Sequence, residues 1–228
     1  MRALRILLVV AVVLGGILVG GDRLAAAWAE SEVAGRASLA GGRTDSVEVD
    51  IKGFPFLTQA ADKRFGEVRV VARGAHTQAG DKSLRIDEIT FDLRDVTVTG
   101  DWSGYRAGEA NGTALISYAD LVAASERATA MEYGGPGKVK VTGSVEVLGR
   151  KVTRTVTSSV TLVDGDTLKV RADEVPGGGI PFLEEMVRER TDFERPIGRV
   201  AGMRVAKVEP RPEGLAVTVN GRDVAIAG

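Results

Sequence analysis

The sequence predicts an α+β fold in which a long, strongly twisted antiparallel sheet curls around a few helices. Two observations predict this fold class. Most of the chain after Gly42 alternates apolar and polar residues with a period of two, which is typical of strands in a sheet covered on one face. Short turn sequences join these strands, and short turns imply antiparallel pairing. A few helix-like segments are available to cover the apolar face.

Residues 1–27 are predicted to be a signal peptide or an N-terminal membrane anchor. Arg2 and Arg5 form a short basic start before an apolar run at residues 6–19. This order is the pattern of an export signal. This run is shorter than the roughly 20 residues that span a bilayer comfortably, although residues 3–21 could span it if Arg5 snorkels. The basic residues place the N-terminus in the cytoplasm, so the rest of the chain would lie outside the membrane.

Cleavage and retention of this segment both have support in the sequence. Small residues spaced by one position at 25–27 and 27–29 suit a signal peptidase. A helix-forming stretch over residues 22–37 favours a retained anchor instead. The two alternatives therefore stay open at this point.

The strands are predicted in chain order. Residues 46–51 alternate apolar and polar side chains, and the alternation continues over 68–72 and 84–98. A phase slip between Ile86 and Ile89 predicts a bulge or a bend. Further strands are predicted at residues 113–117, 139–147, 152–162, 168–170, 203–208, 215–219 and 224–226. Turns are predicted at residues 111–112, 148–150, 164–165 and 220–221.

Four helices are predicted, at residues 22–39, 55–65, 118–129 and 181–192. Pro55 and Pro181 suit the first helical position, where their missing N–H has no cost. Both prolines lie in similar boxes, Gly53-Phe54-Pro55-Phe56-Leu57 and Gly179-Ile180-Pro181-Phe182-Leu183. One interpretation is convergence on a good helix start. The other is a pair of apolar helix tips whose large side chains face a ligand or a membrane, namely Phe54, Phe56, Ile180 and Phe182.

Composition excludes several classes of function. The 228 residues include no cysteine and one histidine, which excludes a disulfide framework, a thiol nucleophile and a histidine-rich metal site. The 30 basic and 31 acidic residues nearly balance, whereas a nucleic-acid binder carries a strongly basic domain or face. We therefore expect no metal, no cofactor and no nucleic-acid partner.

No motif for nucleophilic or metal catalysis occurs in the sequence. Glycine-rich segments at 134–137 and 177–179 lack the spacing of a phosphate-binding loop and are predicted to be linkers. The acidic residues within 87–95 could supply a carboxylate pair for glycoside hydrolysis, but alternation places them on the solvent face. Basic clusters at 150–154 and 188–199 are predicted to be solvated, with an anionic lipid headgroup as the alternative partner.

Several segments together resemble a known family. They are Asp22-Arg23 after the apolar run, the strand at 47–51 that leads into the box at 53–57, and four closing segments: Gly202-Met203-Arg204-Val205, Val208-Glu209-Pro210, Glu213-Gly214-Leu215 and Gly221-Arg222-Asp223-Val224. Over about residues 2–226 the chain is similar to the LmeA-like proteins of the actinobacterial cell envelope.

The resemblance implies export, association with the plasma membrane, and binding of phospholipids, including phosphatidylinositol and its mannosylated forms. It links the chain to elongation of the mannan of lipomannan, without a role as a recognised glycosyltransferase. It also implies a fold similar to tubular lipid-binding modules, in which a curled sheet and helices enclose an apolar groove. The family carries no catalytic motif that could be transferred to this sequence.

We therefore expect residues 28–228 to form a single lipid-binding α+β domain that is not an enzyme. It would hold or shuttle a phospholipid or glycolipid at the outer face of the plasma membrane, in cell-envelope glycolipid biogenesis. The predicted lipid-binding residues are Phe54, Phe56, Leu57, Ile180, Phe182 and Leu183. The alternative is an envelope scaffold that binds a protein partner through a sheet edge or an apolar patch. An envelope enzyme with paired carboxylates is the third hypothesis.

Overall fold

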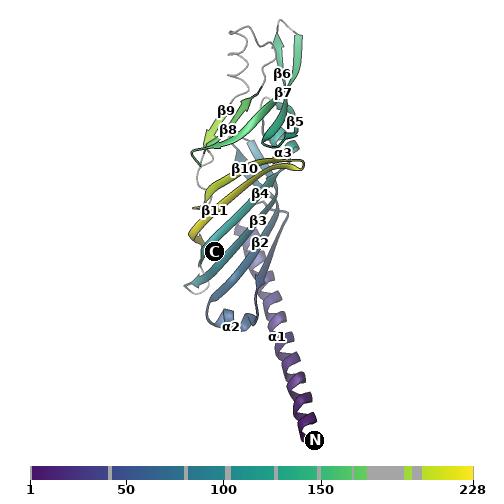
Figure 1. Cartoon of the computed structure of the whole chain (residues 1–228), viewed down its shortest axis with the longest axis vertical. Coiled ribbons are helices and arrows are strands. Elements are labelled where there is room, and N and C mark those ends of the chain that lie inside the picture. Colours follow the sequence, from purple (N-terminus) through teal and green to yellow (C-terminus); the bar gives the residue numbers. More distant parts are fainter. Residues whose placement is uncertain are drawn as a thin grey trace.

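The computed structural model describes residues 2–40, 43–79, 82–100, 104–125, 128–147, 150–165, 167–173, 193–196 and 202–227. They form two open antiparallel sheets, one beyond the other along an elongated molecule, with a long helix projecting from one end (Figure 1). The predicted fold class, long antiparallel strands with a few helices, is confirmed.

Sheet A is the larger sheet and lies next to the projecting helix (Figure 1). Its six strands occur in the order β1 (Ser46–Lys52), β2 (Arg64–Ala79), β3 (Lys82–Thr99), β4 (Gly104–Ile116), β11 (Gly214–Ala227) and β10 (Arg204–Arg211). Every neighbouring pair is antiparallel. The C-terminal hairpin of β10 and β11 therefore completes a sheet that the first four strands begin.

Sheet B lies at the other end of the molecule. Its strands occur in the order β5 (Ala128–Gly135), β6 (Lys138–Val147), β7 (Arg150–Val163), β8 (Thr167–Ala172) and β9 (Phe193–Pro196). Between the sheets, helix α3 (Tyr118–Ala124) contacts both β3 and β5, and β10 contacts β5 and β7. The Ser117 hydroxyl caps α3 by accepting the backbone N–H of Asp120 at 3.1 Å.

Helix α1 (Arg2–Ala40) joins the apolar N-terminal run and the predicted helix at 22–39 into one continuous helix. Its first half extends away from the sheets (Figure 1). Its second half packs small and branched side chains against the core beside β1: Ala25, Ala26, Ala29, Val33 and Ala34. The carboxylate of Glu30 also accepts the backbone N–H of Ile51 at 2.7 Å. The stretch Val12–Gly35 is long and apolar enough to cross a membrane by length and composition alone, but its second half is the part that packs beside β1.

A line of irregular positions crosses four adjacent strands of sheet A. Gly66, Asp95, Gly108 and Asp223 lie at the same level on β2, β3, β4 and β11, and strand pairing is interrupted at each of them. Asp95 and Asp223 have left-handed φ values of 50° and 51°. The alternation shifts by one residue along this line, and such positions bend a sheet.

The phase slip expected between Ile86 and Ile89 corresponds to a second irregular position. Gly74 has a φ of 63° and lies opposite Asp87, where pairing between β2 and β3 is interrupted. The register is the same on both sides of this point, so no residue is inserted. Gly74 allows the left-handed backbone that lets both strands continue with their apolar side chains on the same face.

Two predicted helices are shorter than expected. Helix α2 (Phe56–Ala61) ends at the cap residue Asp62, because Lys63 takes a left-handed φ of 53° and Arg64 begins β2. The helix predicted at 118–129 ends at Ala124, because the following segment pairs with β6 as strand β5. Pairing in a sheet outweighs the helical pattern in both places. The helix predicted at 181–192 lies outside the described residues.

Two predicted turns are wrong. Asn111-Gly112 and Asn220-Gly221 lie within the long strands β4 and β11, where Asn111 and Asn220 face each other across the ladder. A Cβ atom on Gly112 would lie 2.4 Å from the ring of Phe91, so this glycine makes room for a neighbouring aromatic side chain. In contrast, the turn predicted at 164–165 is present between β7 and β8.

Candidate functional site

One face of sheet A is almost entirely apolar, and we call it the inner face. Strand register aligns its side chains in rows that cross the sheet. One row contains Val47, Ala72, Ile89, Ala114, Val217 and Val208, the next contains Val49, Val70, Phe91, Gly112, Val219 and Val205, and a third contains Ile51, Val68, Leu93 and Ala110. Because these rows continue across the strands, they form one contiguous apolar surface.

The inner face is covered unevenly. On β1, next to helix α1, Val49 and Ile51 are buried. In the middle of the sheet, Val70 on β2, Phe91 on β3 and Val217 on β11 are only half-buried, whereas Leu93, Ala110 and Val219 of the same rows are buried. Apolar residues that remain partly exposed on a contiguous surface are characteristic of a binding site for an apolar ligand.

The opposite face of the same strands carries charges, and we call it the outer face. Arg69 on β2 pairs with Asp92 on β3 at 2.7 Å, and Arg73 pairs with Glu48 at 2.7 Å and Glu88 at 3.2 Å. The hydrogen bond from Arg69 to Asp92 raises the pKa of the Arg69 guanidinium. Sheet A therefore has one face suited to apolar chains and one suited to water.

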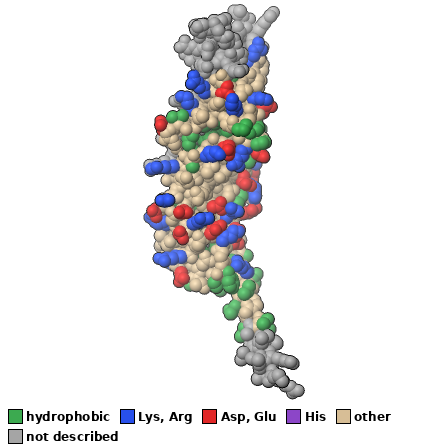
Figure 2. Space-filling model, viewed as in Figure 1, with side chains coloured by type: hydrophobic (Ala, Val, Ile, Leu, Met, Phe, Trp, Pro, Cys, Tyr) green, Lys and Arg blue, Asp and Glu red, His purple; other side chains and the backbone are tan. Residues whose placement is uncertain are grey.

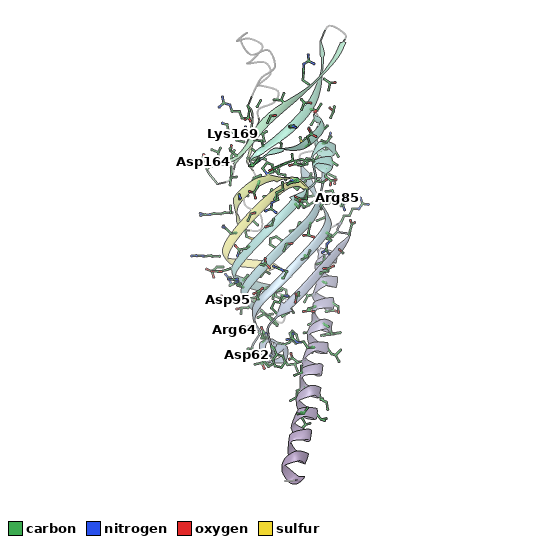
Figure 3. The ribbon with its side chains drawn as sticks, turned by 45° about the vertical axis from the view of Figure 1, so that its right-hand side comes forward. Asp62, Arg64, Arg85, Asp95, Asp164 and Lys169 are labelled. Atoms are coloured by element: carbon green, nitrogen blue, oxygen red, sulfur yellow. The ribbon has the colours of Figure 1, made fainter. Side chains whose placement is uncertain are left out.

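Three of the four acidic residues of β3 have arginine partners, and they do not form a carboxylate pair on the inner face. Asp92 and Glu88 bind arginines on the outer face, and Asp87 pairs with Arg85. Asp95 lies at a bend of the strand, close to the α2 end of the sheet (Figure 3). Among the described residues, no group of three His, Asp or Glu side chains could hold a metal ion. This arrangement supports the interpretation of these carboxylates as surface charges.

The box at residues 53–57 contains side chains with two different environments. Phe56 is 6% exposed and its ring stacks on Phe65, with ring centroids 6.0 Å apart. Phe54 and Leu57 are 56% and 53% exposed. The expectation that Phe56 is exposed at a helix tip is therefore wrong, because its ring packs into the core beside the start of β2. Pro55 precedes the first helical residue as its cap.

Asp22 and Arg23 of α1 hold this box in place. The Asp22 side chain is buried and accepts the backbone N–H groups of Phe56 at 2.9 Å and Leu57 at 2.8 Å. These N–H groups at the start of α2 have no partner within the helix. The guanidinium of Arg23 donates to the carbonyl of Gly53 at 3.3 Å and lies 5.5 Å from the centroid of the Phe54 ring.

Sequence reasoning missed the contact between these two segments. The only signal was that an Asp-Arg pair directly follows a long apolar run, where a charged residue is costly unless it has a partner. The separation of 34 residues between Asp22 and Phe56 gave no indication of the pairing. The other predicted site residues, Ile180, Phe182 and Leu183, lie outside the described residues, as does the glycine run at 177–179.

The glycines at 134–137, expected to form a linker, are instead part of the hairpin between β5 and β6. Gly134 and Gly135 end β5, and Gly137 lies in the turn with a φ of 71°. Of the basic clusters, Arg154 lies exposed on β7, and most of the cluster at 188–199 lies outside the described residues.

Comparison with known families identifies the chain. The family model described as LmeA-like phospholipid-binding matches residues 20–220, which is most of the sequence. The chain belongs to the LmeA-like phospholipid-binding family. This membership confirms the resemblance and assigns phospholipid as the class of ligand. Comparisons with curated proteins and with solved structures find no significant match. The family match begins at residue 20, so it includes Asp22 and Arg23 but not most of the apolar run.

Proposed function

We propose that this protein is exported and holds the acyl chains of a phospholipid on the inner face of sheet A. The carrying observation is that a member of a phospholipid-binding family has an open sheet whose apolar face keeps half-buried residues in its middle, namely Val70, Phe91 and Val217. Transfer of a methylene group from water to an apolar surface contributes about 0.8 kcal/mol. An acyl chain lying across several strands would gain this contribution repeatedly, and the Val-rich rows would lose their exposure to water.

The proposed location is the outer face of the plasma membrane, and the proposed process is cell-envelope glycolipid biogenesis. An apolar N-terminal helix with basic residues before it supports export. Phosphatidylinositol and its mannosides are the proposed ligands, on the strength of the family resemblance. The protein would bind or shuttle lipid without catalysing a reaction, because the carboxylates of β3 named as acid/base candidates either pair with arginines or lie at an outer bend.

The test is lipid retention by the full chain. We would express it in an actinobacterial host, purify it in a mild detergent and record native mass spectra, followed by identification of the released lipid. We expect bound phospholipid in the wild-type protein. A protein that carries no lipid in repeated preparations, and that moves none between vesicles, would contradict the proposal and favour a scaffold that binds a protein partner.

A matched pair of variants locates the binding surface. Val70 and Val71 are consecutive and both half-buried, but Val70 lies on the inner face and Val71 lies between Arg69 and Arg73 on the outer face. Val70→Asn should reduce the fraction of lipid-bound protein several-fold, because it places an amide among the acyl contacts. Val71→Asn should leave that fraction unchanged. An equal effect of both variants would show that the lipid is not held on the inner face.

A further inference from the structure

Helix α1 and helix α2 meet at one point, and this point fixes where the domain ends. Asp22 is 2% exposed, and both of its carboxylate oxygens accept N–H groups of α2. Ala26, one turn further along α1, is 4% exposed within the core. From Asp22 onward, α1 is therefore part of the folded domain. The large apolar side chains described before Asp22 are exposed instead.

Apolar side chains on the preceding part of α1 are exposed. Ile17 and Leu18 are 64% and 72% exposed, and Val12, Val13 and Leu14 are 54–66% exposed. Residues 3–21 would extend about 28 Å as a helix at 1.5 Å per residue. The hydrocarbon core of a bilayer is about 30 Å thick. If this part of α1 crosses the membrane, Asp22 and the α2 helix that it holds lie at the membrane boundary.

The α2 end of the domain has the side chains that a membrane boundary requires. We define the tip as Phe54 and Leu57 on the 53–57 box together with Leu24 of α1, and these three side chains are 53–75% exposed. Hydrophobic side chains gather at this end of the molecule, where α1 leaves the body (Figure 2). Such a group of large exposed apolar residues on a folded domain marks an interaction surface.

Basic residues outnumber acidic ones in the segment that carries the tip. Segment 52–64 contains Lys52, Lys63 and Arg64 but one acidic residue, Asp62, and Arg23 lies against Phe54. Lys52 pairs with Asp50 on β1, and Asp62 and Arg64 both lie at the lower end of sheet A (Figure 3). Basic residues beside an apolar tip match anionic lipid headgroups above an acyl layer. Trp28, one turn beyond Leu24, is 69% exposed and suits the headgroup region, where tryptophan is enriched.

We propose that α1 is retained as a membrane anchor and that Phe54 and Leu57 insert into the outer leaflet of the same bilayer. Asp22 links the two contacts, because it joins the end of the anchor to the start of α2. The domain would then stand on the membrane through its α2 end, with the open inner face of sheet A beginning at the lipid surface. This inference rests on the proposed export, but it concerns the bilayer rather than the carried lipid.

Cleavage after Ala27 would remove the partner of α2. It would separate Asp22 and Arg23 from the box at 53–57, and it would remove the buried Ala26 from the core. The intact mass of the protein from the envelope fraction of the producing cells tests this point. We expect the mass of a chain that retains residues 1–27, and a mature chain that begins at Trp28 or Glu30 would overturn the retained anchor.

The absence of cysteine from the sequence allows a direct test of insertion. Leu57→Cys and Phe54→Cys each introduce a single thiol for an environment-sensitive fluorophore, and Val163→Cys provides the control. Val163 is 37% exposed at the end of β7, next to Asp164, which lies far from Asp62 along the molecule (Figure 3). All three variants would be reconstituted as full chains into vesicles of phosphatidylcholine with about 30% phosphatidylglycerol, which supplies an anionic surface.

Quenching identifies the environment of each label. We expect lipids spin-labelled near the headgroup to quench labels at positions 54 and 57 several-fold more strongly than the label at 163. We expect aqueous iodide to show the reverse order. Equal quenching at all three positions, in variants whose circular dichroism matches the wild type, would overturn the insertion of the tip. Lipid retention measured by native mass spectrometry is independent of this result, so failure of the tip and failure of the lipid-binding function are distinguishable.

Discussion

The two sheets differ in how they are stabilised. Sheet A packs against α1, and at its α2 end it has an aromatic stack and a buried carboxylate that accepts two backbone N–H groups. In sheet B, the described strands are rich in threonine and serine, and polar pairs such as Thr142 with Thr155 at 2.8 Å connect them. Buried valines of sheet B, among them Val139, Val160 and Val170, join the same apolar core as sheet A. We therefore expect sheet A, with the packed half of α1, to be the more stable part of the molecule.

The largest loss of stability is expected from a substitution in the aromatic stack of sheet A. Phe56→Ala removes a buried ring that contacts Phe65, and such substitutions lower the free energy of unfolding by about 3–5 kcal/mol. Phe54→Ala, two residues away, removes an exposed ring and should cost about 1 kcal/mol or less, the scale of its contact with Arg23. Denaturant unfolding of both variants measures the difference. Equal losses would show that the box is not divided into a core residue and a surface residue.

A smaller loss of stability is expected from a substitution where α1 contacts α2. Asp22→Ala leaves the N–H groups of Phe56 and Leu57 without their acceptor, so the denaturant midpoint should fall by less than in Phe56→Ala. Hydrogen exchange at these two amides should become faster. Asp62→Ala is the control, because Asp62 is an exposed residue at the other end of α2.

Hydrogen exchange in these variants tests whether Asp22 holds the start of α2. Unchanged exchange at Phe56 and Leu57 in Asp22→Ala would contradict the role of Asp22 as the link between α1 and α2. Asp22→Asn retains one oxygen that can accept a hydrogen bond, so we expect an intermediate exchange rate. A larger effect of Asp62→Ala than of Asp22→Ala would show that the end of α2, rather than its start, fixes the tip.

The sequence predicted the strands of sheet A well, because alternation is a local signal that burial on one face enforces. It failed where a contact distant in the chain decided the local structure. Asn220-Gly221 has the composition of a turn, but pairing with β4 keeps it extended. The helix expected at 118–129 ends at Ala124, because the next residues pair with β6.

The candidate site was predictable only in part, for the same reason. The exposure of Phe54 agreed with the expectation of an apolar tip, but alternation could not show that the ring of Phe56 stacks on Phe65. The inner face follows from alternation, strand by strand. Its incomplete cover does not, because the position of α1 along β1 depends on tertiary packing.

The smallest change in stability is expected from an ion pair in sheet B, and this change depends on pH. Asp173, which follows β8, pairs with Lys138 of β6 at 2.8 Å and accepts the Ser159 hydroxyl of β7. These hydrogen bonds, first that of Lys138 and then that of Ser159, lower the pKa of the Asp173 carboxyl below its usual 3.8. Because the folded-state pKa is the lower one, the pair stabilises the protein above about pH 4, and this contribution is lost as the pH falls below that value.

Asp173→Asn should therefore lower the stability of sheet B slightly at pH 7 and leave it nearly unchanged at pH 3. The Asp173 carboxylate is partly exposed, so the difference should be small and should decrease further in high salt. Thermal unfolding at both pH values, with Asp164→Asn as an exposed control on the neighbouring turn, measures it. A loss at pH 7 as large as that of Phe56→Ala would show that sheet B depends on its ion pairs as much as sheet A depends on its aromatic core, and would remove the distinction between the two sheets.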